Sequence, residues 1–394
     1  MNGDAAPFGF LSLYLPLPYR VVILFTLGIW FFGLNIHYLQ AIRIDIPLLL
    51  RYTRNTGEPP LHLSIYRIAI VVTALLLTNL LLFWSITHGD PDSVRDWQIL
   101  PISLFLLIPA LFLWPGSNWH RRGRLRFTRM LRRILVGGLD IDLRFSDILL
   151  ADALTSYAKV LGDIIVLSAM AVTRYSSTHP HVDRAYGASL APFAVALPSA
   201  CRLRQCMIEY KRAKAKGLPW AERRPHLLNA AKYASAFPVV VLSYLQLTYN
   251  PEMATGMSID KINRLWLVAV VLNSLYSFWW DVTKDWDLTL FTSSCGAAEF
   301  PFGLRKERHF VNAGFYYVAV GVDLVLRLAW AVKFSGRYTL VEGHVFLMEV
   351  VEVTRRWMWL FLRVEKEWIV TRSAHGLGIL NAAEEGIMMN EYED

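Results

Sequence analysis

The chain has 394 residues, of which 55% are hydrophobic and only 18% are charged. Soluble domains usually carry about 25% charged residues, so this balance, with a mean hydropathy of +0.35, favours an integral membrane protein. The net charge of +8 alone is compatible with a nucleic-acid partner, but the sequence contains no nucleic-acid-binding module and no such partner is expected. The three cysteines show neither metal-ligand spacing nor a disulfide pattern, so we expect no metal and no cofactor.

Apolar runs long enough to cross a membrane follow one another along almost the whole chain. A helix needs roughly 20 residues to span about 30 Å of hydrocarbon. Nine runs reach this length, at residues 21–39, 65–86, 97–114, 148–172, 186–207, 227–249, 265–286, 311–334 and 342–362. The third carries Pro101 and Pro109, which leaves open whether it spans fully. We predict an all-α polytopic membrane protein with about nine transmembrane helices.

Basic residues alternate between the segments that connect these runs. Four segments are rich in lysine and arginine, at residues 40–64, 115–147, 201–226 and 287–310. The alternate segments carry one or two basic residues each, at residues 87–96, 173–185, 250–264 and 335–341. Nine crossings place every basic segment on one side, which the positive-inside rule makes cytosolic. The N-terminus is then lumenal and the C-terminus cytosolic.

Two charged stretches outside the runs have alternative interpretations. The arginine cluster at residues 121–133 is either a topology signal or a surface for anionic lipid or protein. The acidic tail, residues 371–394, is expected to be solvated and disordered, or else to contact a sorting adaptor. No cleaved signal peptide is expected, because residues 1–18 lack a basic segment and a small-residue cleavage site.

The stretch Phe278–Trp286 ends the seventh run and carries two carboxylates. A helix here places Asp281 and Asp285 one turn apart on the same face. Charges within a membrane-length segment are costly, so they normally face a polar cavity or a partner of opposite charge. Five runs supply such charges. The intramembrane charged residues are Asp152, Lys232, Asp281, Asp285, Arg327, Arg355 and Arg356.

These charges suit a tetrahedral oxyanion. Arginine offers a planar fork of donors for phosphate or sulfate and stays charged when partly desolvated. The acids would pair with the cations when no anion is present, and so keep anion affinity weak enough for release. Asp323 with Arg327, and Glu352 with Arg356, are spaced i,i+4 and would hold the arginines in place. The alternative is a set of salt bridges without a ligand, with Trp330 a core residue rather than a gate.

Several of these residues lie in motifs that resemble a known family. The motifs are Leu149-Leu150-Ala151-Asp152-Ala153-Leu154, Asn229-Ala230-Ala231-Lys232-Tyr233, Trp280-Asp281 with Lys284-Asp285-Trp286, Tyr316-Tyr317 through Leu326-Arg327-Leu328-Ala329-Trp330, and Glu352-Val353-Thr354-Arg355-Arg356-Trp357-Met358-Trp359 followed by Arg363-Val364-Glu365. In this order, over residues 148–368, they resemble the EXS domain of eukaryotic phosphate exporters of the xenotropic and polytropic retrovirus receptor type.

The resemblance implies three regions. Residues 1–147 would form an N-terminal membrane region with three helices and a basic cytosolic loop. Residues 148–370 would form the EXS transmembrane domain from helices four to nine, and residues 371–394 an acidic cytosolic tail. The sequence shows no SPX domain, and in this it resembles the ER-retention-defective proteins of the Golgi.

The resemblance also implies a function: a multi-pass Golgi membrane protein that returns lumenal phosphate from glycosylation to the cytosol. Such transport would support the retention of glycosyltransferases and ER proteins. The phosphate contacts would be made by the intramembrane charged residues, with Trp330 as a gate. A further arginine of the exporters, on the helix before the lysine-bearing one, is matched here by Ala191.

Inorganic phosphate, membrane lipids and a cytosolic adaptor for glycosyltransferase sorting are the expected partners. The alternative function is a Golgi scaffold or sorting factor that recruits the glycosyltransferase-recycling machinery without transport. An enzyme is not expected and no catalytic residue is assigned, because no nucleophile and base pair stands out. Channel versus carrier, phosphate versus sulfate, and oligomeric state stay open.

Overall fold

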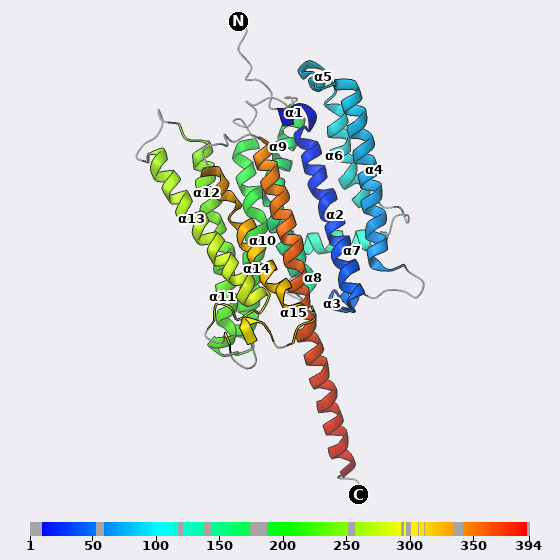
Figure 1. Cartoon of the computed structure of the whole chain (residues 1–394), viewed down its shortest axis with the longest axis vertical. Coiled ribbons are helices and arrows are strands. Elements are labelled where there is room, and N and C mark those ends of the chain that lie inside the picture. Colours follow the sequence, from blue (N-terminus) through cyan, green and yellow to red (C-terminus); the bar gives the residue numbers. More distant parts are fainter. Residues whose placement is uncertain are drawn as a thin grey trace.

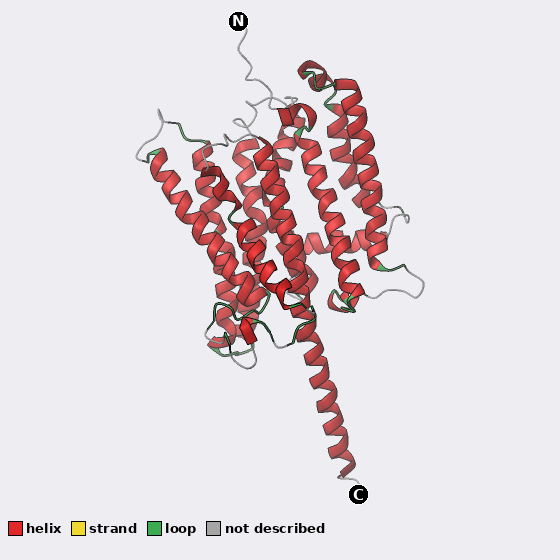
Figure 2. Ribbon diagram, in the orientation of Figure 1, coloured by secondary structure: helices red, strands yellow, loops and turns green. Residues whose placement is uncertain are grey.

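The computed structural model describes a helical bundle, and the residues it describes contain no strand (Figure 2). They are residues 10–52, 59–114, 116, 121–137, 143–173, 187–250, 257–292, 295–296, 301–305, 307–310, 312–334 and 342–391. Long helices run alternately up and down the bundle (Figure 1). The short helices α1 and α5 lie at one end, here called the α1 end, and α3 lies at the opposite end, called the α3 end.

The N-terminal helices form a layer at one edge of the bundle (Figure 1). They are α1 (Phe10–Tyr14), α2 (Leu17–Ala41), α3 (Ile46–Leu49), α4 (Leu61–Thr87), α5 (Pro91–Asp96) and α6 (Ile99–Leu113). Proline lies in the first turn of α2, where its fixed φ suits a helix start. α2, α4 and α6 pack on one another through a buried cluster that includes Tyr19, Val72 and Phe83. The hydroxyl of Tyr19 donates to Asn79 Oδ1 at 2.6 Å, so the polar end of this buried ring is satisfied.

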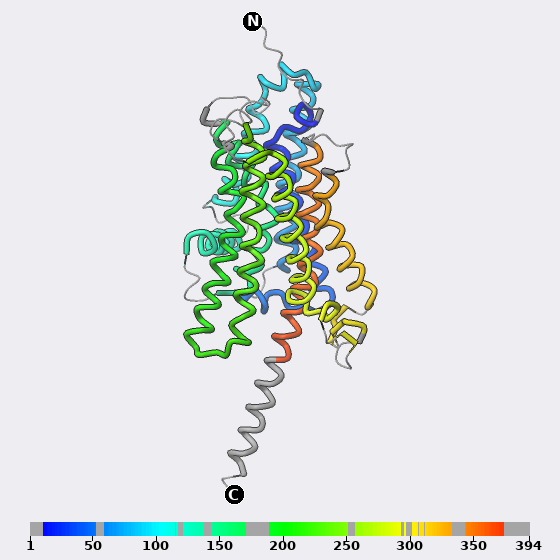
Figure 3. Tube along the Cα trace, turned by 90° about the vertical axis from the view of Figure 1, so that its left-hand side faces the viewer, coloured from blue at the N-terminus to red at the C-terminus, as the bar shows by residue number. Residues whose placement is uncertain are grey.

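Polar side chains hydrogen-bond to helix ends on both sides of this layer. Asp90 caps α5, and the hydrogen bonds from the Ser93 backbone N–H and hydroxyl hold the pKa of Asp90 below its usual value. At the opposite end, α7 (Arg121–Leu135) runs across the other helices (Figures 1 and 3). Buried Arg124 of α7 donates to the carbonyls of Leu111 and Trp114, which end α6 without an intrahelical partner.

The remaining helices form the second part of the bundle. They are α8 (Phe145–Ser156), α9 (Ala158–Thr173), α10 (Gly187–Ala215), α11 (Trp220–Ala234), α12 (Ala236–Leu247), α13 (Ile259–Trp280), the π turn η2 (Asp281–Asp285), the 3₁₀ turn η3 (Pro301–Gly303), α14 (Ala313–Arg327), the 3₁₀ turn η4 (Ala329–Phe334) and α15 (Glu342–Glu391). α10 lies beside α9, α11 and α12 (Figure 3). α15 packs against α2, α8 and α14, and so joins both parts of the bundle.

Four described helices are long and apolar enough to cross a membrane: Leu17–Ala41, Leu61–Thr87, Pro91–Leu113 and Ile259–Asp285. The pair Phe145–Ser156 and Ala158–Met170, bent by 67°, makes a fifth if it counts as one span. These helices support a membrane protein. The third of them contains the run with Pro101 and Pro109. Nine crossings stay a prediction, because the other long helices carry buried charges that lower their hydropathy.

Two sequence predictions about connecting segments were wrong. The segment 201–226 is not a loop: α10 continues to Ala215, and α11 begins at Trp220 after Gly217 and Pro219. The acidic tail is not irregular either, because α15 continues to Glu391. Residues 379–385 include leucine, alanine and glutamate and contain neither glycine nor proline, which suits a continued helix.

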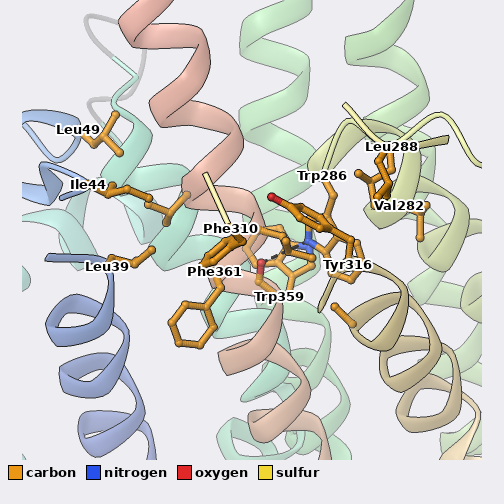
Figure 4. Close-up of a cluster of buried hydrophobic side chains, with 14 of the residues drawn as sticks. Leu39, Ile44, Leu49, Val282, Trp286, Leu288, Phe310, Tyr316, Trp359 and Phe361 are labelled. Carbon is orange, nitrogen blue, oxygen red and sulfur yellow. Dashed lines mark hydrogen bonds between the residues drawn. The ribbon is translucent and has the colours of Figure 1, made fainter. Parts of the chain in front are cut away.

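A core of aromatic residues closes the α3 end of the bundle. Trp286, Trp359, Tyr316 and Phe310 pack together there with Phe361 (Figure 4). They surround a fully buried carboxylate, Glu365 of α15. Glu365 accepts hydrogen bonds from Arg305 at 2.6 Å, from the His309 backbone N–H at 2.7 Å and from the Tyr316 hydroxyl. One side chain therefore ties α14 and the segment 301–310 to α15.

Replacing Glu365 by Ala should destabilise the protein by about 3–5 kcal/mol, because Arg305 then lies buried without its counter-charge. Glu367→Ala is a matched control: its pair with Arg363 is partly exposed, with 28% of the Glu367 side chain accessible, and its loss should cost about 0–1 kcal/mol. The measurement is unfolding of the purified protein in mixed micelles. Equal losses in the two variants would contradict the assigned role of Glu365.

Candidate functional site

Asp281 is the carboxylate around which the cations gather. It is 1% exposed. Arg327 of α14 donates to its Oδ2, Arg355 Nη1 lies 3.5 Å from the same oxygen, and Lys232 Nζ lies 3.6 Å from Oδ1. One aspartate therefore holds cations from α11, α14 and α15. Lys232 and Arg327, which lie far apart in the sequence, face the same carboxylate.

Two further carboxylates complete this centre. Asp285, one π turn after Asp281, lies 3.3 Å from Lys232 Nζ. Asp323 is fully buried and accepts from Arg355 Nη1 at 3.0 Å, and its Oδ2 lies 3.5 Å from Arg327 Nε. The predicted i,i+4 pair of Asp323 with Arg327 is therefore present. Each cation here contacts at least two carboxylates, so none of these charges is buried alone.

The backbone is irregular at four places beside this centre. α13 gives way to the π turn at Asp281, where the Trp286 N–H reaches back to the Asp281 carbonyl. α11 ends two residues after Lys232, α14 ends at Arg327, and the α8–α9 bend follows Ser156. In a membrane, irregular backbone is tolerated where it lines a polar space or lies within protein. The breaks therefore coincide with the charged centre.

Glu352 connects this centre to α8. Its Oε1 lies 2.6 Å from Arg355 Nη2 and accepts from the Ser156 hydroxyl at 2.7 Å. The predicted pair of Glu352 with Arg356 was wrong, because the i,i+3 partner Arg355 takes the carboxylate. The Glu352 side chain is 37% exposed although it is held between two helices of the bundle. Its side chain is therefore accessible in part.

Arg356 differs from the other cations of the site. Its Nε donates to Ser156 Oγ and its Nη2 to Thr155 Oγ1, both at 3.0 Å. Its guanidinium lies 4.6 Å from the centroid of the Trp359 ring. Among the described residues no carboxylate lies within ion-pair distance of Arg356. It is held by hydroxyls and an aromatic face and has no direct ion pair, although the Ser156 hydroxyl links it to Glu352.

Asp152 forms a neighbouring group with two residues that the sequence reasoning missed. Arg202 of α10 lies 2.7 Å from Asp152 Oδ1, and the Tyr233 hydroxyl donates to the same atom at 2.5 Å. Lys232 Nζ lies 4.8 Å from the Tyr233 ring centroid, which joins this group to the Asp281 centre. Arg202 also donates to Gln205.

Arg202 was assigned to a cytosolic loop because it begins a run of basic residues. It is instead 3% exposed, on the helix before the one that carries Lys232. The comparison with Ala191 therefore missed an arginine on that helix. The signal was present in the sequence: apolar Leu203, Cys206 and Met207 continue the helical pattern, and the first turn residues are Gly217 and Pro219.

The site contains as many acids as bases. The five carboxylates are Asp152, Asp281, Asp285, Asp323 and Glu352, and the five cations are Arg202, Lys232, Arg327, Arg355 and Arg356. With every group ionised, these side chains sum to zero charge. Trp330, predicted as a gate, follows the end of α14. It donates to Ser274 Oγ at 3.1 Å and packs edge-on against Trp266.

Residues 15–369 match the model of the EXS family. The chain belongs to the EXS family. It is 29% identical to Protein ERD1 homolog 1 of Schizosaccharomyces pombe, over 90% of this chain and 91% of that protein. It is 27% identical to Protein ERD1 of Kluyveromyces lactis, over 91% of this chain and 95% of that protein. It is also 27% identical to Phosphate transporter PHO1 of Arabidopsis thaliana, over 89% of this chain and 42% of that protein.

Arg202→Met should destabilise the EXS bundle by about 3–5 kcal/mol, because Asp152 is then a buried carboxylate without its cation. Adding Asp152→Asn to this variant removes the unpaired charge and should recover most of the lost stability. Unfolding of the two single variants and the double variant in mixed micelles gives the coupling energy. Additive losses would show that the two residues do not depend on each other.

Proposed function

We propose that this protein transports inorganic phosphate across the Golgi membrane, from the lumen to the cytosol. The observation that carries the proposal is Arg356, a guanidinium held by Ser156 and Thr155 and without a carboxylate partner among the described residues. It lies beside an otherwise charge-paired cluster. Membership of the EXS family, and likeness to a protein named a phosphate transporter, support phosphate as the anion.

An arriving phosphate would bind first where a cation has no direct ion pair. Arg356 offers a planar fork of charge-assisted donors. The hydroxyls of Thr155 and Ser156 accept from it and donate to the Asp152 carbonyl and to Glu352. Glu352, whose side chain is partly accessible, holds Arg355. A phosphate oxygen can take the place of this carboxylate and so recruit a second guanidinium. When phosphate leaves, Glu352 pairs with Arg355 again, which keeps affinity weak enough for release.

The proposed topology has nine crossings. α10, the α11–α12 pair, the α14–η4 pair and α15 run along the same bundle as the helices that are long and apolar enough to span (Figure 1). They carry Arg202, Lys232, Arg327 and Arg355, which reach their counter-charges inside the bundle. By the positive-inside rule, the segments rich in arginine and lysine favour an orientation with the α3 end and the C-terminus in the cytosol and the α1 end in the lumen.

A second candidate function is a Golgi scaffold that recruits sorting factors for glycosyltransferases. The observation that favours it is α15, which continues as a helix to Glu391 through the acidic tail. Such a helix would suit a cytosolic adaptor. A scaffold has no need for a half-buried cation inside the bundle that lacks a direct ion pair, which is why transport is the stronger proposal. Trp330, beside the end of α14, is proposed to gate the path.

Arg356→Gln should fold normally but lower phosphate flux by about 10–100-fold. The variant orphans no carboxylate, and a charge-assisted contact is worth roughly 1.5–3 kcal/mol, with about 1.4 kcal/mol per factor of ten. The measurement is uptake of labelled phosphate by proteoliposomes. Arg363→Gln, which removes a cation paired with Glu367, is the matched control and should keep its flux. Wild-type flux in Arg356→Gln would refute the site.

The same variants separate transport from scaffolding in cells. If transport supports glycosyltransferase retention, Arg356→Gln loses retention although the cytosolic surface is intact. Removal of residues 380–394 then has no effect. The scaffold function requires the reverse pattern, with retention normal in Arg356→Gln and lost in the truncated protein. Immunofluorescence of a Golgi glycosyltransferase in the two strains distinguishes them.

The nine-crossing topology predicts which loops enter the lumen. A glycosylation acceptor inserted between α12 and α13 should be glycosylated. α12 ends and α13 begins at the α1 end, which is lumenal in this topology. An acceptor inserted at Gly217, between α10 and α11, should stay unmodified in the cytosol. Gel mobility before and after endoglycosidase treatment gives the result. Modification of the Gly217 acceptor would contradict the crossing pattern.

A further inference from the structure

A second acidic group lies outside the charged centre, between α9 and α15. Asp163 of α9 is 6% exposed and Glu349 of α15 is 7% exposed. The carboxyl groups of Glu349 and Asp163 lie close enough to interact electrostatically, and residues flanking both pack on one buried cluster. Two acids from different helices therefore meet in the interior of the bundle, and neither has a part in the contacts of the phosphate site.

The surroundings of this pair are apolar. Val160 and Leu167 of α9 and Val353 of α15 belong to one buried cluster with Val21 and Leu24 of α2. Residues next to the two acids in sequence, including Ile164, Phe346 and Val350, pack on the same cluster. An ionised carboxylate is expensive in such surroundings, and two in contact repel each other as well.

A proton would let the two acids bond to each other. An ionised carboxylate is acceptor only, so two ionised acids can only repel each other. Oε1 of Glu349 receives no hydrogen bond from any part of the chain that the structure describes. A proton on one of the two acids supplies the missing donor and removes one of the two adjacent negative charges.

Nearby cations balance the charge that remains. Lys159 of α9 contacts Asp163 Oδ1, and its side chain is 54% exposed. Arg20 of α2 also faces the pair electrostatically, although its Nε donates to the Leu15 carbonyl and its Nη2 to Ser12 of α1. On α15 the nearest ionisable residues in sequence are His344 and Glu352.

The position of the pair relates it to the phosphate site. Glu349 precedes Glu352 by three residues on α15, or about 4.5 Å along the axis, on the side of the α1 end, where α15 begins close to Leu11 of α1. In the proposed topology this is the lumenal side. In that topology, an anion that enters from the lumen would reach Arg356 from this side of α15.

We propose that Asp163 and Glu349 form a proton-binding site on the lumenal approach to the phosphate site. The pair holds one proton when the lumenal side is acidic and releases it to lumenal water at higher pH. The proton cancels one negative charge in the path of the incoming anion, so phosphate enters faster from an acidic lumen. This effect on transport rests on the proposed function, whereas proton binding by the pair does not.

Infrared spectroscopy of the purified full-length protein in liposomes tests proton binding directly. A protonated carboxyl group has a C=O stretching band separate from those of carboxylates, and the wild type should show such a band that disappears as the pH rises. Glu349→Gln should lose this band, whereas Glu367→Gln, at a partly exposed ion pair, should keep it. Lys159→Met should shift its disappearance to higher pH, because the cation that favours the ionised pair is gone.

Phosphate uptake with the lumenal pH varied and the cytosolic pH fixed tests the consequence. Wild-type flux should rise on lumenal acidification, and Glu349→Gln, which carries a neutral side chain at every pH, should stay near the acidic wild-type rate throughout. The protonation state of phosphate changes with pH in the same way for both proteins. The test is therefore the difference between their flux–pH profiles. The same pH response in Glu349→Gln as in the wild type overturns the effect on transport.

The two measurements fail separately. If the titrating band is absent in the wild type, or persists in both Glu349→Gln and Asp163→Asn, the pair is not a proton site. If no protein carries phosphate while the band behaves as expected, the proposed function is wrong and the proton site stands.

Discussion

The cost of a charge in an apolar bundle is the constraint that shapes this protein. Asp281 is almost fully buried and contacts Lys232, Arg327 and Arg355 from three other helices. Loss of any one of these partners would leave a charge without compensation, which costs several kcal/mol in a low-dielectric interior. The helices α11, α13, α14 and α15 therefore have one mutual arrangement in which all these groups are paired, and electrostatics sets their register as much as shape does.

The broken helices follow from the same constraint. Asp281 and Asp285 lie in the π turn at 281–285 and not in regular α-helix. Both carboxylates lie close to Lys232. Breaks at Ser235 and Leu328 end α11 and α14 just after their cations. The aromatic core around Trp286 and Trp359 closes the bundle below these breaks and supplies the packing that irregular backbone lacks.

The sequence predicted the helical class and the residues that carry charge into the bundle, because long apolar runs and rare intramembrane charges are strong local signals. It predicted the partners less well. The i,i+4 spacing favoured a pair of Glu352 with Arg356, but Arg355 pairs with this carboxylate. Arg356 donates to hydroxyls of α8 instead. Sequence periodicity does not predict such a contact between helices. Arg202 was missed because the basic residues of segment 201–226 were interpreted as a loop. The apolar pattern of α10 continues past Arg202.

Charge balance distinguishes a site that conducts an anion from one that stores it. A cluster of cations alone would bind phosphate tightly and release it slowly, whereas five carboxylates opposite five cations give each cation but one an internal competitor for the ligand. Arg356 is the exception, and its hydroxyl partners are neutral, so it attracts an anion without holding a carboxylate in its place. The proton on the Asp163–Glu349 pair would extend this balance toward the lumen, because it removes negative charge before the anion arrives and leaves the paired centre unchanged.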